Sequence, residues 1–381
     1  MKKNYKARAS RPPGRNSFVI AFRHPLMGGR KVCKGLSTDD KITAERYEKE
    51  MNALLSRTDL HSVTGRQAAA RLFNSRVVEI FYDDCLPSTI RIKIPWAPLN
   101  PSQFHYLPCP ICGTFQYSVI KSLVINFSEF FIVICSQCGM KWRNPIPDEE
   151  FLVDLYGPRY FEGRYDGILN KQVGIGDSTD QDKQMRIMRT EEELSRWIDL
   201  AASDPQYACL SPRDSYEKPR RFLEIGGGRG YLQAAAQSRG FSTIGLEISP
   251  LGIRAAIEKN LLVFPIQLDE FCGKYLEYAG FFDVVAFFDF LEHVPSPRSV
   301  LTMVRQIMKD DGIAIFRVPC IELEETPKWH LADHIWHFSD ETIRRLLDKE
   351  GFAILDEPRK SGRFPGEDGQ VQNMTYFVRK V

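Results

Sequence analysis

Three glycines and two acids in the second half of the chain have the types and spacing of a ligand-binding loop. Gly226, Gly228 and Gly230 follow a short apolar run, and Glu224 stands two residues before the first of them. Glu247 ends the next apolar run along the chain. Glycines let a ligand approach the backbone and permit a tight turn with positive φ. The helix expected after them adds N–H groups and a partial positive charge at its start.

Those residue types also indicate which ligand fits. The dinucleotide fingerprint GxGxxG needs glycine at position 231, where the chain has Tyr231. A carboxylate at Glu224 suits a cationic ligand better than a phosphate, and a carboxylate at Glu247 can accept both hydroxyls of a ribose. Together these features describe S-adenosylmethionine (SAM). A glycine turn in an ordinary α/β protein accounts for them equally well.

Motifs farther along the chain favour the first interpretation. The run Phe282-Asp-Val-Val285 is typical of a buried strand, and Leu291-Glu-His-Val-Pro295 of the polar loop after it. With the stretch Glu224–Gly230 and Glu247, they resemble class I SAM-dependent methyltransferases, in the subgroup of the ubiquinone-biosynthesis O-methyltransferases. The resemblance covers residues 221–381. It implies an α/β fold with a doubly wound, Rossmann-like sheet that binds its ligand at the carboxyl ends of the strands.

The resemblance also implies roles for individual residues. The stretch 224–230 is expected to hold the methionine portion of SAM, Glu247 the ribose, and Asp269 and Phe288 the two sides of the adenine. The full predicted cofactor site is Tyr160, Glu224, Gly226, Gly228, Gly230, Glu247, Asp269, Phe288 and Asp289. One departure is Lys309-Asp-Asp-Gly312, a predicted turn away from the cofactor, where the family usually has Lys-Pro-Gly-Gly.

A histidine after the fourth predicted strand is the candidate catalytic residue. Methyl transfer from a sulfonium mainly needs the two partners to be positioned. A hydroxyl, amine or carbon acid also needs a base, and His293 stands where ligands bind in open α/β sheets. Alternatively, His293 bonds a backbone carbonyl and only caps its loop. His334 and His337 can line the acceptor pocket, or hold a divalent ion with Glu292 and His293.

Four cysteines form the pattern CxxC-x22-CxxC, which predicts a structural zinc site: Cys109, Cys112, Cys135 and Cys138. A glycine follows each pair, and β-rich stretches lie between the pairs. Asn144-Pro145, Tyr156-Gly157 and Tyr160-Phe161 come next. A zinc ribbon that runs into such a linker resembles the N-terminal part of many SAM methyltransferases, some of which act on sugars or glycans. Tyr160 is expected over the methionine end of SAM, or as an anchor for the ribbon.

The first 38 residues carry ten Lys or Arg and no Asp or Glu, although the whole chain has a net charge of only +2. Strands are expected at 17–23 and 30–34, after a flexible segment 1–11, with a helix at 41–57. This basic ββα module resembles the arm-type DNA-binding domain of phage integrases through Phe18–Phe22, Arg30-Lys31, Gly35–Thr38 and Ala44. A small appendage that packs on the main body is the alternative.

The sequence therefore predicts five segments: a basic module (1–57), a connecting segment (58–105), a zinc ribbon (106–145), a linker with a leading helix (146–220) and a methyltransferase domain (221–381). The predicted function is transfer of a methyl group from SAM to an O, N or C atom of a small molecule or glycan. The alternative is a nucleic-acid-binding protein that uses residues 1–57 on DNA or RNA. No apolar run approaches a membrane span, so no membrane partner and a cytoplasmic location are expected.

Overall fold

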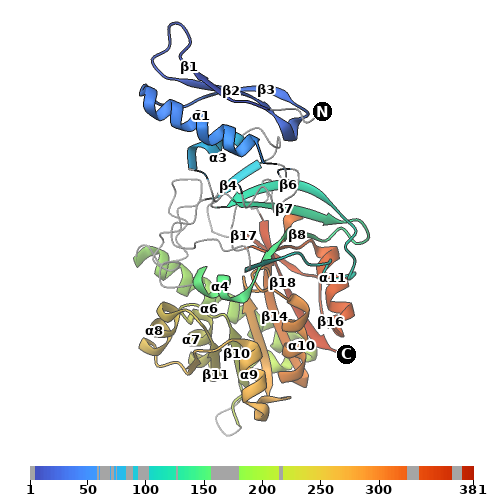
Figure 1. Ribbon diagram of the computed structural model, residues 1–381. Helices are drawn as coiled ribbons and strands as arrows, with labels where there is room; N and C mark the ends of the chain where they lie inside the picture. Colours follow the sequence, from blue (N-terminus) through green and yellow to red (C-terminus); the bar gives the residue numbers. More distant parts are fainter. Residues whose placement is uncertain are drawn as a thin grey trace. The chain divides into compact units, whose positions relative to one another are not determined.

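The computed structural model describes residues 5–57, 60, 69, 73, 75–82, 89–92, 103–125, 128–155, 180–213, 218–323, 334–362 and 371–381. The chain divides into two compact units, residues 1–102 with 119–133 and residues 103–118 with 134–381 (Figure 1). Tyr160 lies outside the described residues. Within the described residues, no helix is both long enough and apolar enough to cross a membrane.

The first unit begins with a three-stranded antiparallel sheet covered by helices. The strands β1 (Arg8–Ser10), β2 (Val19–His24) and β3 (Arg30–Gly35) lie in that order, with the 3-10 helix η1 (Pro25–Met27) in the second turn. Helix α1 (Lys41–Leu55) begins at Asp40, whose carboxylate accepts from the first turn. Helix α3 (Ser75–Tyr82) adds to the same core.

The expectation that residues 1–11 are flexible is wrong for the part that the structure describes, because β1 pairs with β2 from Arg8 to Ser10. Side chains of α1 hold this edge strand in place. Asn52 Oδ1 accepts from the Ala7 amide at 2.7 Å, and Glu48 Oε2 accepts from the Ala9 amide at 2.6 Å. No local sequence pattern indicates these bonds, which join residues about forty positions apart.

The second unit is built on one large sheet with the order β12-β11-β10-β13-β14-β18-β16, with β17 also paired to β18. Strands β10 (Arg221–Ile225), β11 (Ser242–Leu246), β12 (Val263–Phe264), β13 (Phe282–Phe288) and β14 (Met308–Pro319) are parallel. Strands β16 (Phe352–Ile354), β17 (Arg359–Gly362) and β18 (Val371–Lys380) are antiparallel additions. The strand order reverses at β10, as in doubly wound folds.

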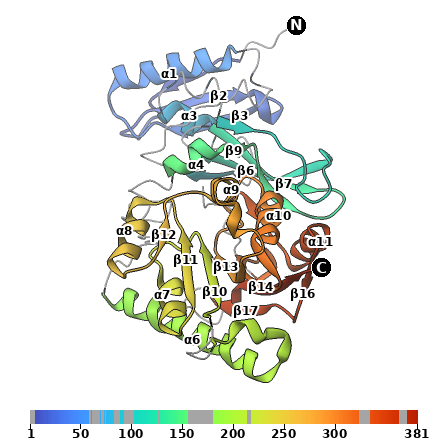
Figure 2. The same cartoon turned by 90° about the horizontal axis from the view of Figure 1, so that it is seen from below.

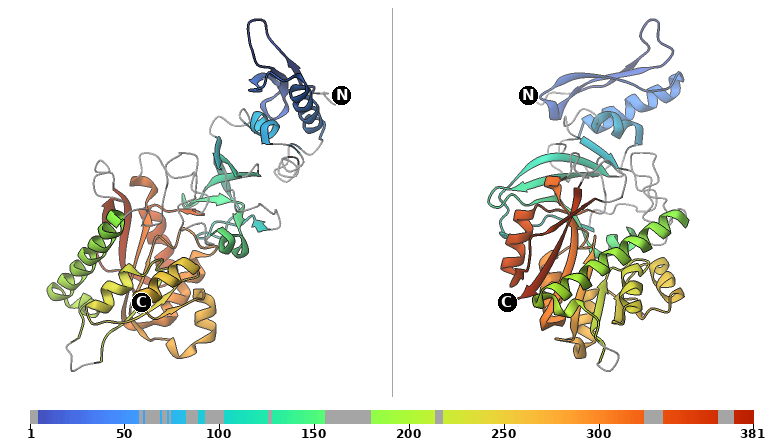
Figure 3. Two further views of the ribbon diagram at one scale, coloured as in Figure 1. Left: turned by 90° about the vertical axis from the view of Figure 1, so that its left-hand side faces the viewer. Right: turned by 180° about the vertical axis from the view of Figure 1, so that it is seen from behind.

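Helices cover both faces of this sheet (Figures 2 and 3). Helices α6 (Asp180–Ser203) and α7 (Tyr231–Ser238) pack on one face with the 3-10 helix η3 (Pro205–Leu210), around Trp197 and Phe222. Helices α9 (Leu268–Lys274), α10 (Pro297–Ile307) and α11 (Asp340–Lys349) follow later strands. The other helical segments among the described residues of this unit are α4 (Glu149–Leu155), α8 (Pro250–Glu258), η4 (Leu276–Tyr278) and η5 (Ile321–Leu323). The predicted α/β, Rossmann-like fold is confirmed.

The other described strands lie outside the large sheet and pair among themselves. β6 (Tyr117–Ile125) pairs in parallel with β4 (Thr89–Ile92), and β7 (Ser128–Cys135) follows it. β5 (Phe104–His105) pairs with β9 (Ile146–Pro147). β8 (Lys141–Asn144) pairs with β15 (Trp336–His337). The predicted turn at 309–312 lies instead within β14, where the register against β13 shifts.

Candidate functional site

The glycine loop lies at the carboxyl end of β10, where the strand order reverses. Gly226 has a φ of 66°, and a Cβ there would lie 2.7 Å from the Phe290 ring. Gly230 has a φ of 70° and begins α7, and a Cβ there would lie 2.7 Å from Leu261. Both positions therefore exclude any larger residue, because L side chains rarely adopt this backbone and the space is filled. The loop exposes backbone at the place where this fold binds ligands.

Glu224 lies directly beneath the loop. Its side chain is buried, and Oε2 accepts from the Gln233 amide in the first turn of α7 at 2.9 Å. A Cβ on Gly227 would lie 2.8 Å from this carboxyl group, which shows how closely the loop covers it. Burial raises the pKa of Glu224 to about 8. A cation bound near this carboxyl group would favour its ionised form and lower its pKa.

Glu247 closes the other side of the loop from the end of β11. Its Oε2 accepts from the Gly228 amide at 2.6 Å, and its Oε1 accepts from the Ser249 amide at 2.7 Å. Burial raises the pKa of Glu247 as well. Each carboxylate oxygen has a second lone pair, so both can still accept a hydroxyl hydrogen. The structure thus brings Glu224, Glu247 and the three glycines together, as the sequence pattern requires.

The other predicted cofactor residues take different positions. Asp269 is exposed in the first turn of α9, just after β12. Phe288 ends β13, where its ring meets Trp197 edge-on at 5.9 Å, and the Arg317 guanidinium lies 4.8 Å from the ring centroid. Asp289 has a φ of 49° and pairs with Arg317 through contacts of 2.6 and 3.3 Å. Their roles toward adenine stay predictions.

Arg317 contacts two of the predicted cofactor residues and was not singled out from the sequence. It reaches Phe288 and Asp289 because β13 and β14 pair in register, with Phe288 opposite Arg317. The Asp289 amide also donates to the Arg317 carbonyl at 2.9 Å. No local motif marks this arginine, since its ion-pair partner Asp289 lies 28 positions earlier in the chain.

His293 lies in the loop after β13, beside a buried acid and a second histidine. Its Nε2 is 3.6 Å from Glu292 Oε1, and its ring lies edge-on to that of His334 at 4.8 Å. One ligand atom from each of these three residues lies within 4.8 Å of the others, so the group can hold a metal ion. His337 is not part of this group. It is buried in β15, and burial lowers its pKa to about 3, with Arg143 and Lys141 adding to the effect.

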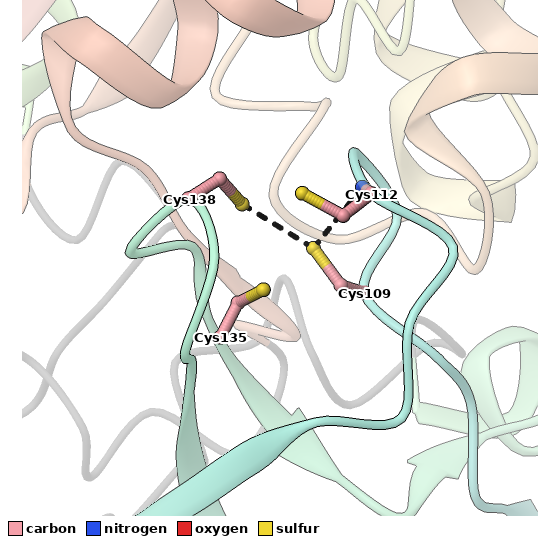
Figure 4. Close-up of side chains that lie close together, drawn as sticks. All are labelled: Cys109, Cys112, Cys135 and Cys138. Atoms are coloured by element: carbon pink, nitrogen blue, oxygen red, sulfur yellow. Dashed lines mark hydrogen bonds between the residues drawn. The ribbon is translucent and has the colours of Figure 1, made fainter.

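The four cysteines of the predicted zinc site come together within the second unit (Figure 4). The sulfur atoms of Cys109 and Cys138 are 3.5 Å apart, close to the ~3.8 Å separation of tetrahedral zinc ligands with Zn–S bonds of about 2.3 Å. The amides of Cys112 and Gln137 point at the sulfurs of Cys109 and Cys135, each at 3.4 Å. The donor set and its knuckle turns therefore fit zinc.

Both knuckles close through a glycine. Gly113 and Gly139 have φ values of 70° and 73°, and their amides donate to the carbonyls of Cys109 and Cys135. Burial raises the pKa of the Cys109 and Cys138 thiols, whereas hydrogen bonds from the Gln137 and Cys138 amides lower that of Cys135 against its own burial. All four cysteines are unbridged.

Residues 189–357 match a family model described as a methyltransferase domain. Ubiquinone biosynthesis O-methyltransferases of several Escherichia coli strains are 31% identical over 144 residues, which cover 34% of this chain and 59% of theirs. The chain thus spans about three fifths of the length of these relatives.

Solved structures with a similar arrangement include magnesium protoporphyrin IX methyltransferase of Synechocystis PCC 6803 with bound SAM. It is 16% identical with a TM-score of 0.40, covering 62% of this chain and 99% of that one. Another is 1,6-didemethyltoxoflavin-N1-methyltransferase of Burkholderia thailandensis, 17% identical with a TM-score of 0.36, covering 52% and 89%.

Proposed function

We propose that this chain, which contains a class I SAM-dependent methyltransferase domain, moves a methyl group from SAM to an O, N or C nucleophile of a small molecule or glycan. The observation that carries the proposal is the pair of buried acids on either side of the glycine loop. Glu224 suits the cationic methionine end of SAM, and Glu247 suits the ribose hydroxyls. SAM supplies an electrophilic methyl group when it is bound.

His293 is the proposed base for the acceptor. It lies in the loop after β13, one residue after the buried Glu292, whose carboxylate can stabilise a positively charged imidazole. Removal of a proton from a hydroxyl, amine or carbon acid would leave that charge on His293. A divalent ion held by Glu292, His293 and His334 is the alternative use of the same side chains.

Calorimetry with SAM tests the cofactor proposal. Glu247→Ala should weaken SAM binding by about 1.5–3 kcal/mol, the range for hydrogen bonds to a charged group. The matched control is Glu258→Gln, which changes an exposed acid on α8 and should leave the affinity unchanged. Unchanged affinity in Glu247→Ala would remove this residue from the site, and absence of SAM binding in the wild type would refute the proposal.

The four cysteines are proposed to hold one structural zinc ion. Four thiolates fill a tetrahedral site and leave no open position for a substrate, so the ion would stabilise the fold rather than take part in the chemistry.

Screening of small molecules and glycans with labelled SAM should identify the methyl acceptor.

A second function, DNA binding by the N-terminal module, is favoured by one face of its sheet. Arg8 pairs with Ala21, which pairs with Cys33, and Arg23 pairs with Lys31. Paired residues share a face, so these side chains point away from the core that Phe22 and Val32 form with α1. The arginines and the lysine are exposed.

The character of this face fits duplex DNA. The small residues Ala21 and Cys33 lie between the cations and leave the backbone of the sheet open to approach by phosphates. Single-strand readers instead stack bases on aromatic side chains, whereas Phe22 faces the core here. We therefore propose contacts to phosphates from the exposed cations of β1, β2 and β3.

Binding to mixed-sequence duplex DNA at several salt concentrations tests this second function. Changing Arg8, Arg23 and Lys31 together to Ala should reduce the slope of log affinity against log salt by about 3. Changing Lys41 and Lys49 on α1 to Ala is the control and should change it little. Equal losses in both variants would contradict a specific role for the sheet face.

A further inference from the structure

The segment from His334 to His337 connects the cysteine cluster to the loop that carries His293. On its ribbon side, Trp336 lies opposite Trp142 in the pairing of β15 with β8, and the Arg143 amide donates to the Ile335 carbonyl at 2.8 Å. Strand β8 begins three residues after Cys138. One residue before β8, the Met140 carbonyl accepts from the Cys135 amide at 2.8 Å, so the second cysteine knuckle leads directly into this pairing.

On its other side, the same segment holds the loop of His293 by three hydrogen bonds. The amides of Ile335 and Trp336 both donate to the Glu292 carbonyl, at 2.8 and 3.2 Å. The Trp336 indole Nε1 donates to the Val294 carbonyl at 2.6 Å. The two carbonyls that bracket His293 in the chain are therefore fixed by residues of β15. The residue just before Ile335 is His334, whose ring faces that of His293.

The glycine loop is held by other elements. The Gly226 amide donates to the Leu246 carbonyl at 2.8 Å, and the Gly228 amide donates to the Glu247 carboxylate. Leu246 is the last residue of β11, and Glu247 directly follows it. The hydrogen bonds thus hold the two halves of the site to different elements, the glycine loop to β11 and the loop of His293 to β15, while the Phe290 ring of the second loop packs beside Gly226.

We infer that Trp336 is a positioning residue. When zinc orders the ribbon (106–145), Trp336 packs against it and thereby holds the loop of His293 in place. Zinc release would then loosen the acceptor side of the site and leave SAM binding at the glycine loop intact. The inference rests on the proposed function. Its physical basis is that Trp336 pairs with β8 and also donates its indole N–H to the Val294 carbonyl, so loss of the pairing would release the residue that holds this carbonyl.

Amide hydrogen exchange tests the inference without any acceptor. Trp336→Phe keeps the ring but removes the N–H, and exchange in residues 290–294 should become about tenfold faster, as expected for the loss of one hydrogen bond. Trp197→Phe is the matched control, because Trp197 is also buried and donates its indole N–H, to Glu193 at 3.0 Å on α6. It should leave residues 290–294 unchanged. An equal effect of both variants, or none in Trp336→Phe, would overturn the inference.

Zinc content, SAM affinity and steady-state kinetics distinguish a positioning role of Trp336 from a general loss of stability. Trp336→Phe should keep about one zinc per chain and bind SAM within about twofold of the wild type. With an acceptor from the labelled-SAM screen, kcat should fall about tenfold while KM for SAM stays the same. A matching rise in KM for SAM would show that the variant disturbs the whole domain, against the inference.

Zinc removal from the unmodified protein provides a test that does not depend on the folding of a variant. A chelator should speed exchange in residues 290–294 as well as in 109–112 and 135–140, with the SAM dissociation constant unchanged. Faster exchange confined to the cysteine knuckles would refute the coupling. Failure of the wild type to bind SAM would refute the proposed function instead, since the exchange measurement does not use SAM.

Discussion

Replacement of Glu224 by Gln should make the cofactor-free protein more stable while weakening its binding of SAM. Burial raises the pKa of this carboxyl group from 4.5 to about 8, so at pH 7 the folded protein must hold a proton that the unfolded chain has released. Gln is neutral and of similar shape, and its oxygen can still accept from the Gln233 amide. The variant avoids the cost of protonating or burying a carboxylate.

The size of the effect follows from the two pKa values. The Glu224 carboxyl group has a pKa of 4.5 in the unfolded chain. From that pH up to pH 7, the free energy of unfolding of the wild type should fall by about 1.4 kcal/mol per pH unit, or about 3 kcal/mol in all. This figure changes little if the folded pKa is one unit higher or lower, because the group is at least half protonated at pH 7 in each case. The loss levels off above the folded pKa.

The sign of the pH dependence gives the test. A raised carboxyl pKa makes its contribution to stability fully present below pH 4.5 and progressively lost up to about pH 8. Urea unfolding of both proteins, without SAM, should therefore give equal free energies near pH 4.5. The Gln variant should be more stable by about 3 kcal/mol at pH 7. A difference that does not change with pH, or a less stable variant at pH 7, would refute the assignment of a buried, protonated Glu224.

SAM binding at pH 7 should release up to about one proton in the wild type and none in Glu224→Gln, because the cationic ligand favours the ionised carboxylate; calorimetry in buffers of different ionisation enthalpy measures this. Cys138→Ser should abolish binding of about one zinc per chain, measured by elemental analysis, with Cys272→Ser as a control outside the cluster. Ser339→Ala removes the capping box of α11 and should lower the free energy of unfolding by about 1 kcal/mol. Retained zinc in the first serine variant, or unchanged stability in the alanine variant, would contradict these assignments.

The sequence alone determined the features that depend on nearby residues. The glycine loop between β10 and α7 was predictable because the turn, the apolar strand and the helix are contiguous. The helix predicted at 41–57 is observed at Lys41–Leu55, because apolar periodicity and caps are local signals. The spacing of the four cysteines likewise predicted their cluster, since each pair occupies a single turn.

The tertiary structure decided which distant side chains meet. His334, not His337, lies with Glu292 and His293, because β15 turns His337 into the core. Arg317 reaches Asp289 only through the register of β13 and β14, and β1 is ordered by side chains of α1. Sequence patterns report residue types and local spacing. The contacts that complete this site depend on strand pairing between segments far apart in the chain, which only the packed sheet fixes.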